Sequence, residues 1–260
     1  MYNYETIKVI ITKQERKRGV FMIKVGIVGA TGYAGAELIS LLLQRDDVKI
    51  VGFGSKSFAG ESYSKVFRSM YKYADDICEN DNISELSKKA DIIFTATPQG
   101  FLAENINDEV LANAKVIDLS ADFRIKDVDV YEKWYKLEHK SKGLIKEAVY
   151  GLPELYREDI KKARLIANPG CYPTCSILSL QPLLKHKLID KNSIIIDAKS
   201  GTSGAGRSAK VDNLFCEVNE NMKAYGIGSH RHTPEIEAQL SKAAGEDIVI
   251  SFTPHLVPMM

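Results

Sequence analysis

Hydrophobic positions in the first half of the chain cluster in short β-branched runs, with glycine turns and helical segments between them. Residues 23–28 form such a run, which ends at Gly29 and a glycine-rich turn. The stretch that follows, as far as about Arg45, has its leucines on one helical face. A second run at 48–53 completes a strand–turn–helix–strand unit of about 30 residues.

Two later runs, 91–96 and 115–119, are apolar at consecutive positions rather than at alternate ones. Strands of this kind are typical of a parallel sheet that is covered by helices on both faces. The order of the elements therefore predicts an α/β fold with a Rossmann dinucleotide-binding domain.

The pattern changes after residue 150, where short strands and helices alternate with loops rich in glycine, proline and hydroxyl residues. We expect a strand at 165–167, a helix at 176–185, a strand at 194–198, a helix at about 234–244 and a final strand at 248–253. The division that follows is an N-terminal extension at 1–21, expected to be poorly ordered, a Rossmann domain at 22–168 and a second, α+β domain at 169–260.

Composition narrows the classes of function. The chain has 260 residues, is 45% hydrophobic and 27% charged, and therefore has the makeup of a globular protein rather than a disordered one. Its formal net charge of +1 argues against nucleic acid or an anionic membrane as the main partner. No apolar run approaches the roughly 18 residues of a membrane span. Four cysteines and the lack of a signal-peptide pattern favour a reducing, cytoplasmic environment.

The glycine-rich turn has the spacing of Gly29, Gly32 and Gly35, a variant of the dinucleotide-binding pattern. Glycine allows a tight turn and a close approach of the backbone to a pyrophosphate, and the N-terminus of the following helix offers free N–H groups. Thr31 adds a hydroxyl donor. The alternative is a glycine loop that only turns the chain. The candidate cofactor-binding residues of this turn are Gly29, Thr31, Gly32, Tyr33, Ala34 and Gly35.

The end of the second strand bears on the choice of nucleotide. An NAD site usually places an acidic residue there to hold the ribose 2′-hydroxyl, and this chain has none. Ser55, Lys56 and Ser57 offer hydroxyls and a cation for a 2′-phosphate instead, so we expect NADP rather than NAD. The alternative is that Lys56 is only a solvated loop charge.

A cysteine loop forms the second candidate site. Cys171 follows a short strand and Asn168-Pro169-Gly170, and it precedes the expected helix. A thiol at a helix N-terminus has a lowered pKa, and the same N–H groups can stabilise an oxyanion on a bound carbonyl. The alternative is a buried structural cysteine. Cys175, four residues further along, is expected in the core, and the two cysteines lack the additional ligands of a metal site.

Two of the five histidines, His230 and His232, lie close together and are candidates for general acid–base chemistry beside the thiol. If their segment is extended, their side chains point in opposite directions and only one faces the site. Thr233 is a candidate helix cap, with Pro234 at the first helical position.

Two loops at strand ends carry candidate anion-binding groups. Ser120 and Arg124 follow the strand at 115–119, on the carboxyl side where open parallel sheets bind ligands. The loop 199–207 adds hydroxyls, glycines, a lysine and Arg207, which suit a phosphate or a carboxylate. The alternative for each of these charges is an ordinary position on the surface.

Seven stretches of the chain, in this order, closely resemble the N-acetyl-gamma-glutamyl-phosphate reductase family, the arginine-pathway relatives of aspartate-semialdehyde dehydrogenase. They are KVGIVGATGYAGAEL, VIDLSADFR, AVYGLPEL, ANPGCYPT, AKSGTSGAGR, SHRHTPEIE and SFTPHLVPM, and they extend over nearly the whole chain from Met22. The set is more specific than any single glycine motif. It implies a Rossmann domain followed by an α+β catalytic and dimerisation domain of the glyceraldehyde-3-phosphate dehydrogenase type, in a homo-oligomer (dimer or tetramer).

The resemblance implies NADPH-dependent reduction of N-acetyl-glutamyl 5-phosphate to N-acetyl-glutamate 5-semialdehyde, with release of phosphate. Cys171 matches the family nucleophile, which attacks the acyl phosphate and forms a thioester that hydride then reduces through a thiohemiacetal. His230 is expected as the acid–base residue, with His232 second. Further cofactor-binding residues are expected at Pro98, Ser203 and Gly204. The expected substrate-binding residues are Ser120, Arg124, Asn168, Arg207 and Glu235.

Two departures from the family pattern stand out. Pro98-Gln99-Gly100 lies where family members often have Pro-His-Gly. The family pattern also continues beyond Met260, so we expect a C-terminally incomplete second domain with an exposed sheet edge and impaired stability or activity.

Three other functions are compatible with parts of this pattern. The first is a related acyl-phosphate or semialdehyde reductase with an aspartyl or aminoadipyl type of substrate. The second is a catalytically silent NADP-binding or subunit-interaction fragment. The third is a cysteine hydrolase, which does not explain the glycine turn.

Overall fold

The computed structural model describes residues 22–260, and the N-terminal extension predicted at 1–21 lies outside them. The chain divides into two compact units, the first ending at Pro169 and the second beginning at Gly170.

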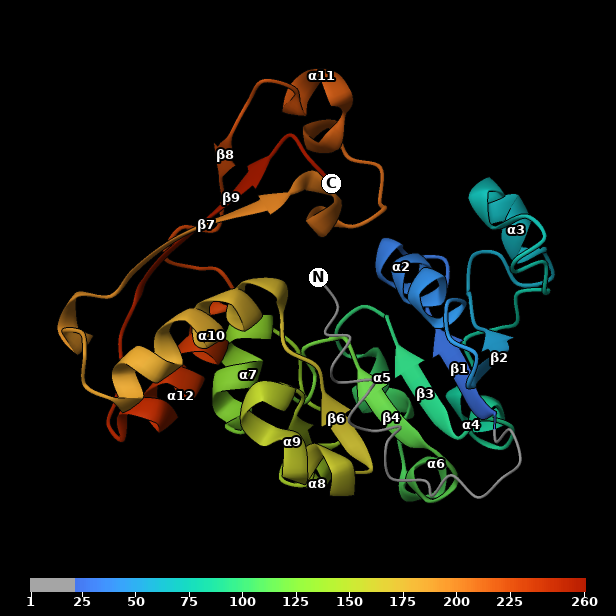
Figure 1. The fold of residues 1–260 in the computed structure, drawn as a ribbon, viewed down its shortest axis with the longest axis horizontal. Coiled ribbons are helices and arrows are strands. Elements are labelled where there is room, and N and C mark those ends of the chain that lie inside the picture. Colours follow the sequence, from blue (N-terminus) through green and yellow to red (C-terminus); the bar gives the residue numbers. More distant parts are fainter. Residues whose placement is uncertain (1–21) are drawn as a thin grey trace. The chain divides into compact units, whose positions relative to one another are not determined.

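A six-stranded sheet forms the centre of the first unit (Figure 1). Its strands lie in the order β2-β1-β3-β4-β6-β5, and every neighbouring pair is parallel. They are β1 (Ile23–Val28), β2 (Val48–Phe53), β3 (Ile92–Thr95), β4 (Lys115–Asp118), β5 (Val149–Tyr150) and β6 (Leu165–Ala167). The five strands expected in this part of the chain are confirmed, and the two-residue β5 is an addition that no run of apolar residues predicts.

Helices cover both faces of this sheet. They are α2 (Tyr33–Leu42), α3 (Tyr63–Val66), α4 (Ile83–Ser87), α5 (Phe101–Asn105), α6 (Asp108–Asn113), α7 (Val128–Tyr135), α8 (Lys142–Ile145) and α9 (Pro153–Lys162), with a 3-10 turn at Arg68–Met70. Residues of α2 and α9 join one hydrophobic core, and residues of α4, α5, α6 and α8 join another. Alternate strand residues supply the two cores: Ile92 and Phe94 of β3 belong to the first and Ile93 to the second. This arrangement explains why the strands lack a polar face.

The helix after the glycine turn is shorter than expected, because it ends at Leu42 and not near Arg45. The Arg45 N–H donates to the carbonyl oxygen of Leu42 at 3.1 Å, and the Arg45 guanidinium pairs with Asp47 at 2.7 Å. This ion pair belongs to the turn that leads into β2, so Arg45 is part of the connection rather than of the helix.

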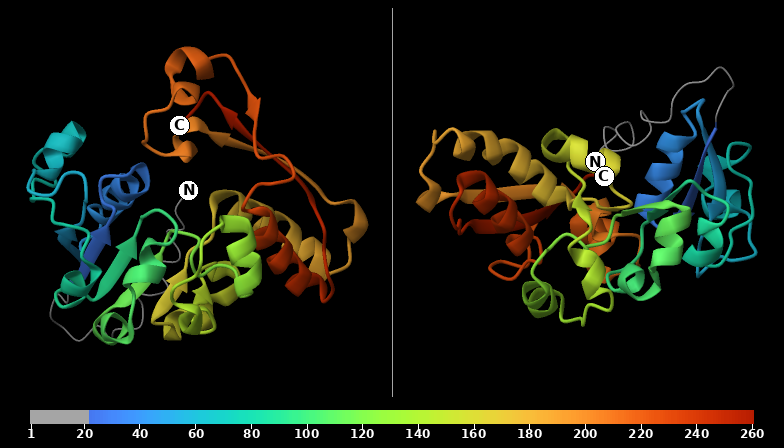
Figure 2. Two further views of the ribbon diagram at one scale, coloured as in Figure 1. Left: turned by 180° about the vertical axis from the view of Figure 1, so that it is seen from behind. Right: turned by 90° about the horizontal axis from the view of Figure 1, so that it is seen from below.

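The second unit has a three-stranded sheet and a pair of long helices (Figures 1 and 2). Its strands are β7 (Ile195–Gly201), β8 (Lys223–Ala224) and β9 (Ser251–Val257), in the order β7-β9-β8, with β7 parallel and β8 antiparallel to β9. Its helices are α10 (Cys171–Lys185), α11 (Phe215–Val218) and α12 (Thr233–Ala244), with 3-10 turns at Lys191–Ser193, Thr202–Ala205 and Val211–Asn213. The helices α10 and α12 lie side by side and share a hydrophobic core with β7 and β9.

Two boundaries in this unit correct the sequence-based expectations. The helix expected at 176–185 begins earlier, at Cys171. Pro173 does not prevent this, since it lies in the first turn, where a proline is tolerated. The final strand expected at 248–253 lies at Ser251–Val257. Ile248 and Ile250 are buried, but their N–H groups donate to the side chains of Ser241 and Glu237 rather than to a neighbouring strand.

Among residues 22–260, no helix is both long and apolar enough to span a membrane.

Candidate functional site

The glycine turn lies at the carboxyl end of β1, where the sheet order changes direction. β2 pairs with one side of β1 and β3 with the other, so the connections leave this point toward opposite edges. Open parallel sheets bind ligands at such a switch point. The turn is therefore the candidate nucleotide site of the first unit.

Two of the three glycines in this turn are required by the backbone around them. Gly29 has a φ of +76°, and a Cβ there would lie 2.4 Å from the carbonyl oxygen of Ala96. A Cβ at Gly35 would lie 2.5 Å from the carbonyl oxygen of Gly29, whereas one at Gly32 would lie at an ordinary 3.6 Å. Gly29 and Gly35 thus allow the tight turn that the pattern predicts, and Gly32 is the residue before α2.

The first turn of α2 supplies the N–H groups of Tyr33, Ala34 and Gly35. The first internal bond of this helix goes from the Ala36 N–H to the carbonyl oxygen of Gly32 at 2.9 Å. The three earlier N–H groups have no hydrogen-bond acceptor among residues 22–260. They form the partially positive end of the helix, which suits a bound phosphate.

Two contacts join the glycine turn to the segment after β2. The hydroxyls of Thr31 and Ser55 are buried and lie 2.7 Å apart. The carboxylate of Asp81 accepts from the Gly29 N–H at 3.0 Å and from the Lys56 N–H at 2.9 Å. Sequence reasoning missed Asp81, because it lies 52 residues from Gly29 and in no motif. Lys56 and Ser57 are exposed, so their proposed contact with a 2′-phosphate stays a prediction.

The loop containing Pro98 is held by a second carboxylate that the sequence did not indicate. Pro98 itself is exposed. Asp122 accepts from the N–H groups of Gly100 at 2.7 Å and Ala103 at 3.1 Å, and from the hydroxyl of Tyr131 at 2.9 Å. Gly100 has a φ of +90° and precedes α5. Asp122 thus acts as a tertiary cap on this helix.

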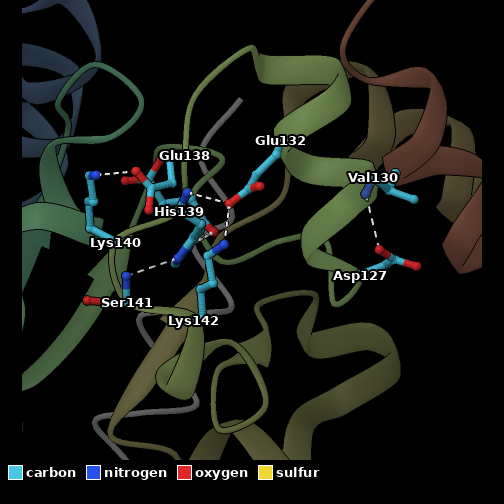
Figure 3. A network of polar contacts seen from close by, with 9 residues as sticks. Asp127, Val130, Glu132, Glu138, His139, Lys140, Ser141 and Lys142 are labelled. Atoms are coloured by element: carbon cyan, nitrogen blue, oxygen red, sulfur yellow. Dashed lines mark hydrogen bonds and ion pairs between the residues drawn. The ribbon is translucent and has the colours of Figure 1, made fainter.

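His139 lies in a polar network with Glu132, Ser141 and Lys142 (Figure 3). Its Nε2 lies 2.7 Å from the carbonyl oxygen of Asp122. Its Nδ1 accepts from the Ser141 N–H at 3.2 Å. Glu132 accepts from the His139 N–H at 3.0 Å and pairs with Lys142 at 2.8 Å. These bonds require the neutral ring with its proton on Nε2, and burial lowers the pKa of His139. We therefore assign this histidine a structural role.

The predicted anion-binding residues Ser120 and Arg124 bond to protein groups. The Ser120 hydroxyl donates to Asp118 at 2.7 Å and accepts from the Asp122 N–H at 3.2 Å. The Arg124 side chain donates from Nε to the carbonyl oxygen of Asn168 and from Nη2 to that of Leu119, both at 2.7 Å.

Asn168 lies beside this arrangement, at the ends of β4 and β6. Its N–H donates to the carbonyl oxygen of Asp118 at 2.8 Å, and its side-chain amide donates to that of Pro169 at 3.2 Å. The first unit therefore brings Ser120, Arg124 and Asn168 together, and these contacts stabilise the loop. Their role in substrate binding stays a prediction.

In the second unit, Cys171 is the first residue of α10 and its side chain is exposed. Gly170 precedes it, and the first internal bond of the helix goes from the Thr174 N–H to the carbonyl oxygen of Gly170 at 2.9 Å. Pro173 has no N–H, and the Gly170 N–H donates to Glu235 at 3.0 Å. Of the N–H groups at the start of α10, those of Cys171 and Tyr172 have no hydrogen-bond acceptor within the described chain.

Cys175 was expected in the core, and this expectation is wrong, because its side chain is exposed. The helix that begins at Cys171 turns Tyr172, Ser176 and Ile177 inward instead.

The two histidines lie together rather than on opposite sides of the chain. Their ring centroids are 4.8 Å apart. Each ring packs edge-on against Tyr172, with centroid distances of 5.7 Å for His230 and 5.9 Å for His232. Opposite directions were expected only for an extended segment, and this segment is a turn, with the Ser229 N–H donating to the carbonyl oxygen of Gly226 at 3.0 Å.

The protonation state of His230 follows from its contacts. Its Nδ1 accepts from the His232 N–H at 3.1 Å, so the neutral ring carries its proton on Nε2. Burial, and to a smaller extent the Arg231 charge, lower the pKa of His230 to about 4. His230 is therefore a neutral hydrogen-bond donor at pH 7.

The entry to α12 differs in detail from the expected cap. His232 is the residue before the helix, and Thr233 is its first residue, with no side-chain cap. The Thr233 N–H instead donates to the carbonyl oxygen of His230 at 2.9 Å. Pro234 lies in the first turn, as expected.

Tyr225 is a site residue that the sequence did not reveal. Its hydroxyl donates to the hydroxyl of Tyr172 at 3.2 Å, and Tyr172 donates to the carbonyl oxygen of His255 at 2.9 Å. The Tyr225 ring lies 5.3 Å from that of His230. A tyrosine pair thus supports the histidines, and no short motif marks it.

The loop after β7 contains the remaining candidates. Ser203 lies half-buried in the 3-10 turn at Thr202–Ala205, while Gly204 and Arg207 are exposed. All three belong to the second unit. Their roles toward cofactor and substrate stay predictions. Among the described residues, no group of three or more His, Cys, Asp or Glu side chains is arranged to hold a metal ion.

Comparison with known families covers both units. Residues 24–163 match the semialdehyde dehydrogenase NAD-binding domain, and residues 171–260 match the semialdehyde dehydrogenase dimerisation domain. The chain belongs to the semialdehyde dehydrogenase family. It therefore has the nucleotide-binding and dimerisation domains of these oxidoreductases, and the predicted α/β fold with a Rossmann domain is confirmed.

Individual relatives of this chain carry a more specific name. Proteins named N-acetyl-gamma-glutamyl-phosphate reductase from Lachnoclostridium phytofermentans and Campylobacter jejuni are 63% and 59% identical to it. These matches cover 92% and 91% of this chain, and 69% and 68% of the relatives. The chain thus spans about two-thirds of their length.

Two solved structures have the same fold. Aspartate semialdehyde dehydrogenase II from Vibrio cholerae, in complex with ASA, has a TM-score of 0.63 at 16% identity, over 92% of this chain and 71% of that one. Aspartate semialdehyde dehydrogenase from Candida albicans, with NADP, has a TM-score of 0.54 at 16% identity, over 92% and 68%.

A nicotinamide dinucleotide fits the residues of the glycine turn. Gly29 and Gly35 lack the Cβ atom that would collide with the backbone of the turn. The first N–H groups of α2 have no hydrogen-bond acceptor among residues 22–260. These are the two features that a pyrophosphate requires of a Rossmann turn.

Proposed function

We propose that this chain catalyses the NADPH-dependent reductive dephosphorylation of N-acetyl-L-glutamyl 5-phosphate, which yields N-acetyl-L-glutamate 5-semialdehyde and phosphate in arginine biosynthesis. Relatives at 54–63% identity carry the corresponding enzyme name. The observation that carries the proposal is the position of Cys171, an exposed thiol on the first residue of α10 beside two N–H groups that have no acceptor in the described chain.

The thiol begins the reaction. As the thiolate, Cys171 attacks the acyl carbon of the substrate. The bond from carbon to the phosphate oxygen breaks, phosphate leaves with the electron pair, and a thioester to Cys171 remains. The N–H groups of Cys171 and Tyr172 are the donors for the oxyanion that forms on the carbonyl oxygen.

The second half of the reaction reduces the thioester. Bound NADPH supplies the hydride for this step. Addition of hydride to the thioester carbon leaves the alkoxide of a thiohemiacetal on Cys171. An electron pair of this oxygen re-forms the carbonyl bond as the carbon–sulfur bond breaks, which releases the aldehyde and the thiolate. His230 holds a proton at Nε2 and so acts as a hydrogen-bond donor to the substrate oxygen. Nδ1 of His230 already accepts a backbone N–H, so it is not open to take up a proton. His232 is therefore the second candidate for proton transfer.

NADP is the proposed nucleotide. Ser55, Lys56 and Ser57 follow β2 with no acidic residue at the strand end. The bond from Asp81 to the Lys56 N–H and the bond between Ser55 and Thr31 tie this segment to the glycine turn. The cation of Lys56 is the group proposed to contact the 2′-phosphate.

The proposed setting is the cytoplasm, and the proposed assembly is a homo-oligomer (dimer or tetramer). The family's dimerisation domain, matched by residues 171–260, supports an assembly of identical chains. The exposed, unpaired thiols of Cys171, Cys175 and Cys216 suit a reducing compartment.

The test is phosphate-dependent reduction of NADP by N-acetyl-glutamate semialdehyde, followed at the absorbance of NADPH. Cys171→Ala should lower the rate at least about 1,000-fold, because the covalent route is lost. Cys175→Ala is the matched control, an exposed thiol one helical turn further along, and should retain the wild-type rate. Turnover by Cys171→Ala at the wild-type rate contradicts the proposal. Nucleotide binding without turnover in the wild type supports a catalytically silent fragment instead, and faster turnover of an aspartyl or aminoadipyl semialdehyde supports a related reductase.

A further inference from the structure

Glu235 is a buried acid whose role the sequence did not resolve. Glu235 lies in the first turn of α12, and only 1% of its surface is exposed. Its Oε1 accepts from the N–H of Gly170 at 3.0 Å, across 65 residues of sequence. A buried carboxylate is costly unless hydrogen bonds compensate it. Here the backbone N–H of Gly170 and the positive end of α12 both do so.

The N–H that Glu235 binds belongs to the residue directly before the nucleophile. Gly170 precedes α10, and Cys171 is the first residue of that helix. Of the N–H groups at the start of this helix, that of Gly170 is occupied by Glu235, and Pro173 has none. The N–H groups of Cys171 and Tyr172 are therefore the pair left to face a substrate oxygen.

We propose that Glu235 is a positioning residue, whose buried carboxylate holds the Gly170 N–H and thereby orients the Cys171 thiol and the two N–H donors, and that it does not bind substrate. This proposal rests on the proposed function. It differs from the expectation that Glu235 binds substrate, because the carboxylate is inside the unit and bonded to backbone.

The charge of Glu235 has a second consequence. A carboxylate bonded to the residue before Cys171 repels negative charge on the sulfur, whereas the N-terminus of α10 attracts it. The nearby phenols of Tyr172 and Tyr225 add no charge at neutral pH, because burial raises the pKa of both. His230, packed on Tyr172, is neutral there as well. Removal of the Glu235 charge should therefore make Cys171 react at lower pH.

The test compares Glu235→Gln, Glu235→Ala and the control Glu237→Gln. Glu237 lies on the same helix, and its carboxylate likewise accepts a backbone N–H, that of Ile250 at 3.2 Å, but it does not contact the cysteine loop. One measurement is the pH profile of Cys171 alkylation by iodoacetamide, followed on its peptide by mass spectrometry so that the other thiols do not interfere. The other is kcat and KM for the semialdehyde.

Glu235→Gln keeps an acceptor oxygen, so kcat should stay within about 3-fold of wild type while the alkylation profile moves to lower pH. Glu235→Ala should lower kcat about 10- to 100-fold with KM nearly unchanged, because the thiol is misplaced. Glu237→Gln should change neither measurement.

A rise of about 10-fold or more in KM for Glu235→Gln, with kcat and the alkylation profile unchanged, overturns the proposal in favour of a substrate ligand. Equal effects of Glu235→Gln and Glu237→Gln also overturn it, because the cause is then a general weakening of α12. If the wild type does not turn over the semialdehyde, the proposed function fails, and the alkylation profiles still decide whether Glu235 positions Cys171.

Discussion

Asp118→Asn should be more stable relative to wild type at neutral pH than at acid pH. The Asp118 side chain is completely buried at the end of β4. It accepts from Thr95 Oγ1 at 2.8 Å, from the Ser120 N–H at 3.0 Å and from Ser120 Oγ at 2.7 Å. Burial, and then the charge of Asp122, raise its pKa to about 6 despite these bonds.

The magnitude follows from this pKa. An Asp in the unfolded chain has a pKa of about 3.9, so folding raises it by about two, and each unit corresponds to about 1.4 kcal/mol. A carboxyl with a raised folded-state pKa stabilises the fold below its unfolded pKa and loses that contribution as pH rises through the folded value. Ionised Asp118 therefore costs about 3 kcal/mol of folding stability at pH 7, most of which appears between pH 4 and pH 7.

The assay is urea unfolding of wild type and Asp118→Asn at pH values from 4 to 7. The asparagine oxygen keeps the bonds from Thr95 and Ser120, and the Ser120 hydroxyl can rotate to accept from the new amide. The stability of Asp118→Asn relative to wild type should rise by about 2 kcal/mol across this range. Asp197→Asn is a control of opposite sign, because the bond from Lys199 lowers the pKa of Asp197. A difference between wild type and Asp118→Asn that is constant with pH would refute the reasoning.

Gly29→Ala should destabilise the first unit by about 2 kcal/mol or more and abolish NADPH binding in a fluorescence titration, because φ is +76° and the new Cβ meets Ala96 at 2.4 Å. Gly32→Ala, with 3.6 Å of space, should retain the stability of the first unit, and equal destabilisation by the two variants contradicts this reasoning. Lys56→Ala should raise the Kd for NADPH about 10-fold and leave that for NADH unchanged, and a parallel change in both Kd values argues against a 2′-phosphate contact. The His230 ring should remain neutral at pH 5 in an NMR titration, because burial lowers its pKa to about 4, and a midpoint near 6.5 would contradict this assignment.

The strands of the first unit could be predicted closely because their signal is local. The runs at 23–28 and 48–53 coincide with β1 and β2, although the second residue of each strand is an exposed lysine. All four residues of β3 are buried, as expected of a strand that is covered on both faces. The same reasoning misplaced β9. Ile248 and Ile250 are as apolar as strand residues, but their N–H groups bond to side chains of α12, and no periodicity distinguishes the two cases.

Helix starts were less predictable where their partners are distant in the chain. The helix expected at 176–185 begins at Cys171, and Pro173 in its first turn is compatible with that start. The entry to α12 was predicted within one residue from Pro234, but the contacts of the preceding histidines depend on a turn at 226–232.

The sequence by itself determined where the candidate site residues lie: the glycines of the turn, and a cysteine after a strand and before a helix. These signals are local, because a positive φ or a helix N-terminus depends on only a few neighbouring residues. Only the tertiary structure decided which backbone N–H groups already have a hydrogen-bond acceptor. Asp81, 52 residues away, binds Gly29, and Glu235, 65 residues away, binds Gly170. Burial likewise set the neutral state of His230. Burial and hydrogen-bond partners arise when distant segments pack together, so no local pattern encodes them.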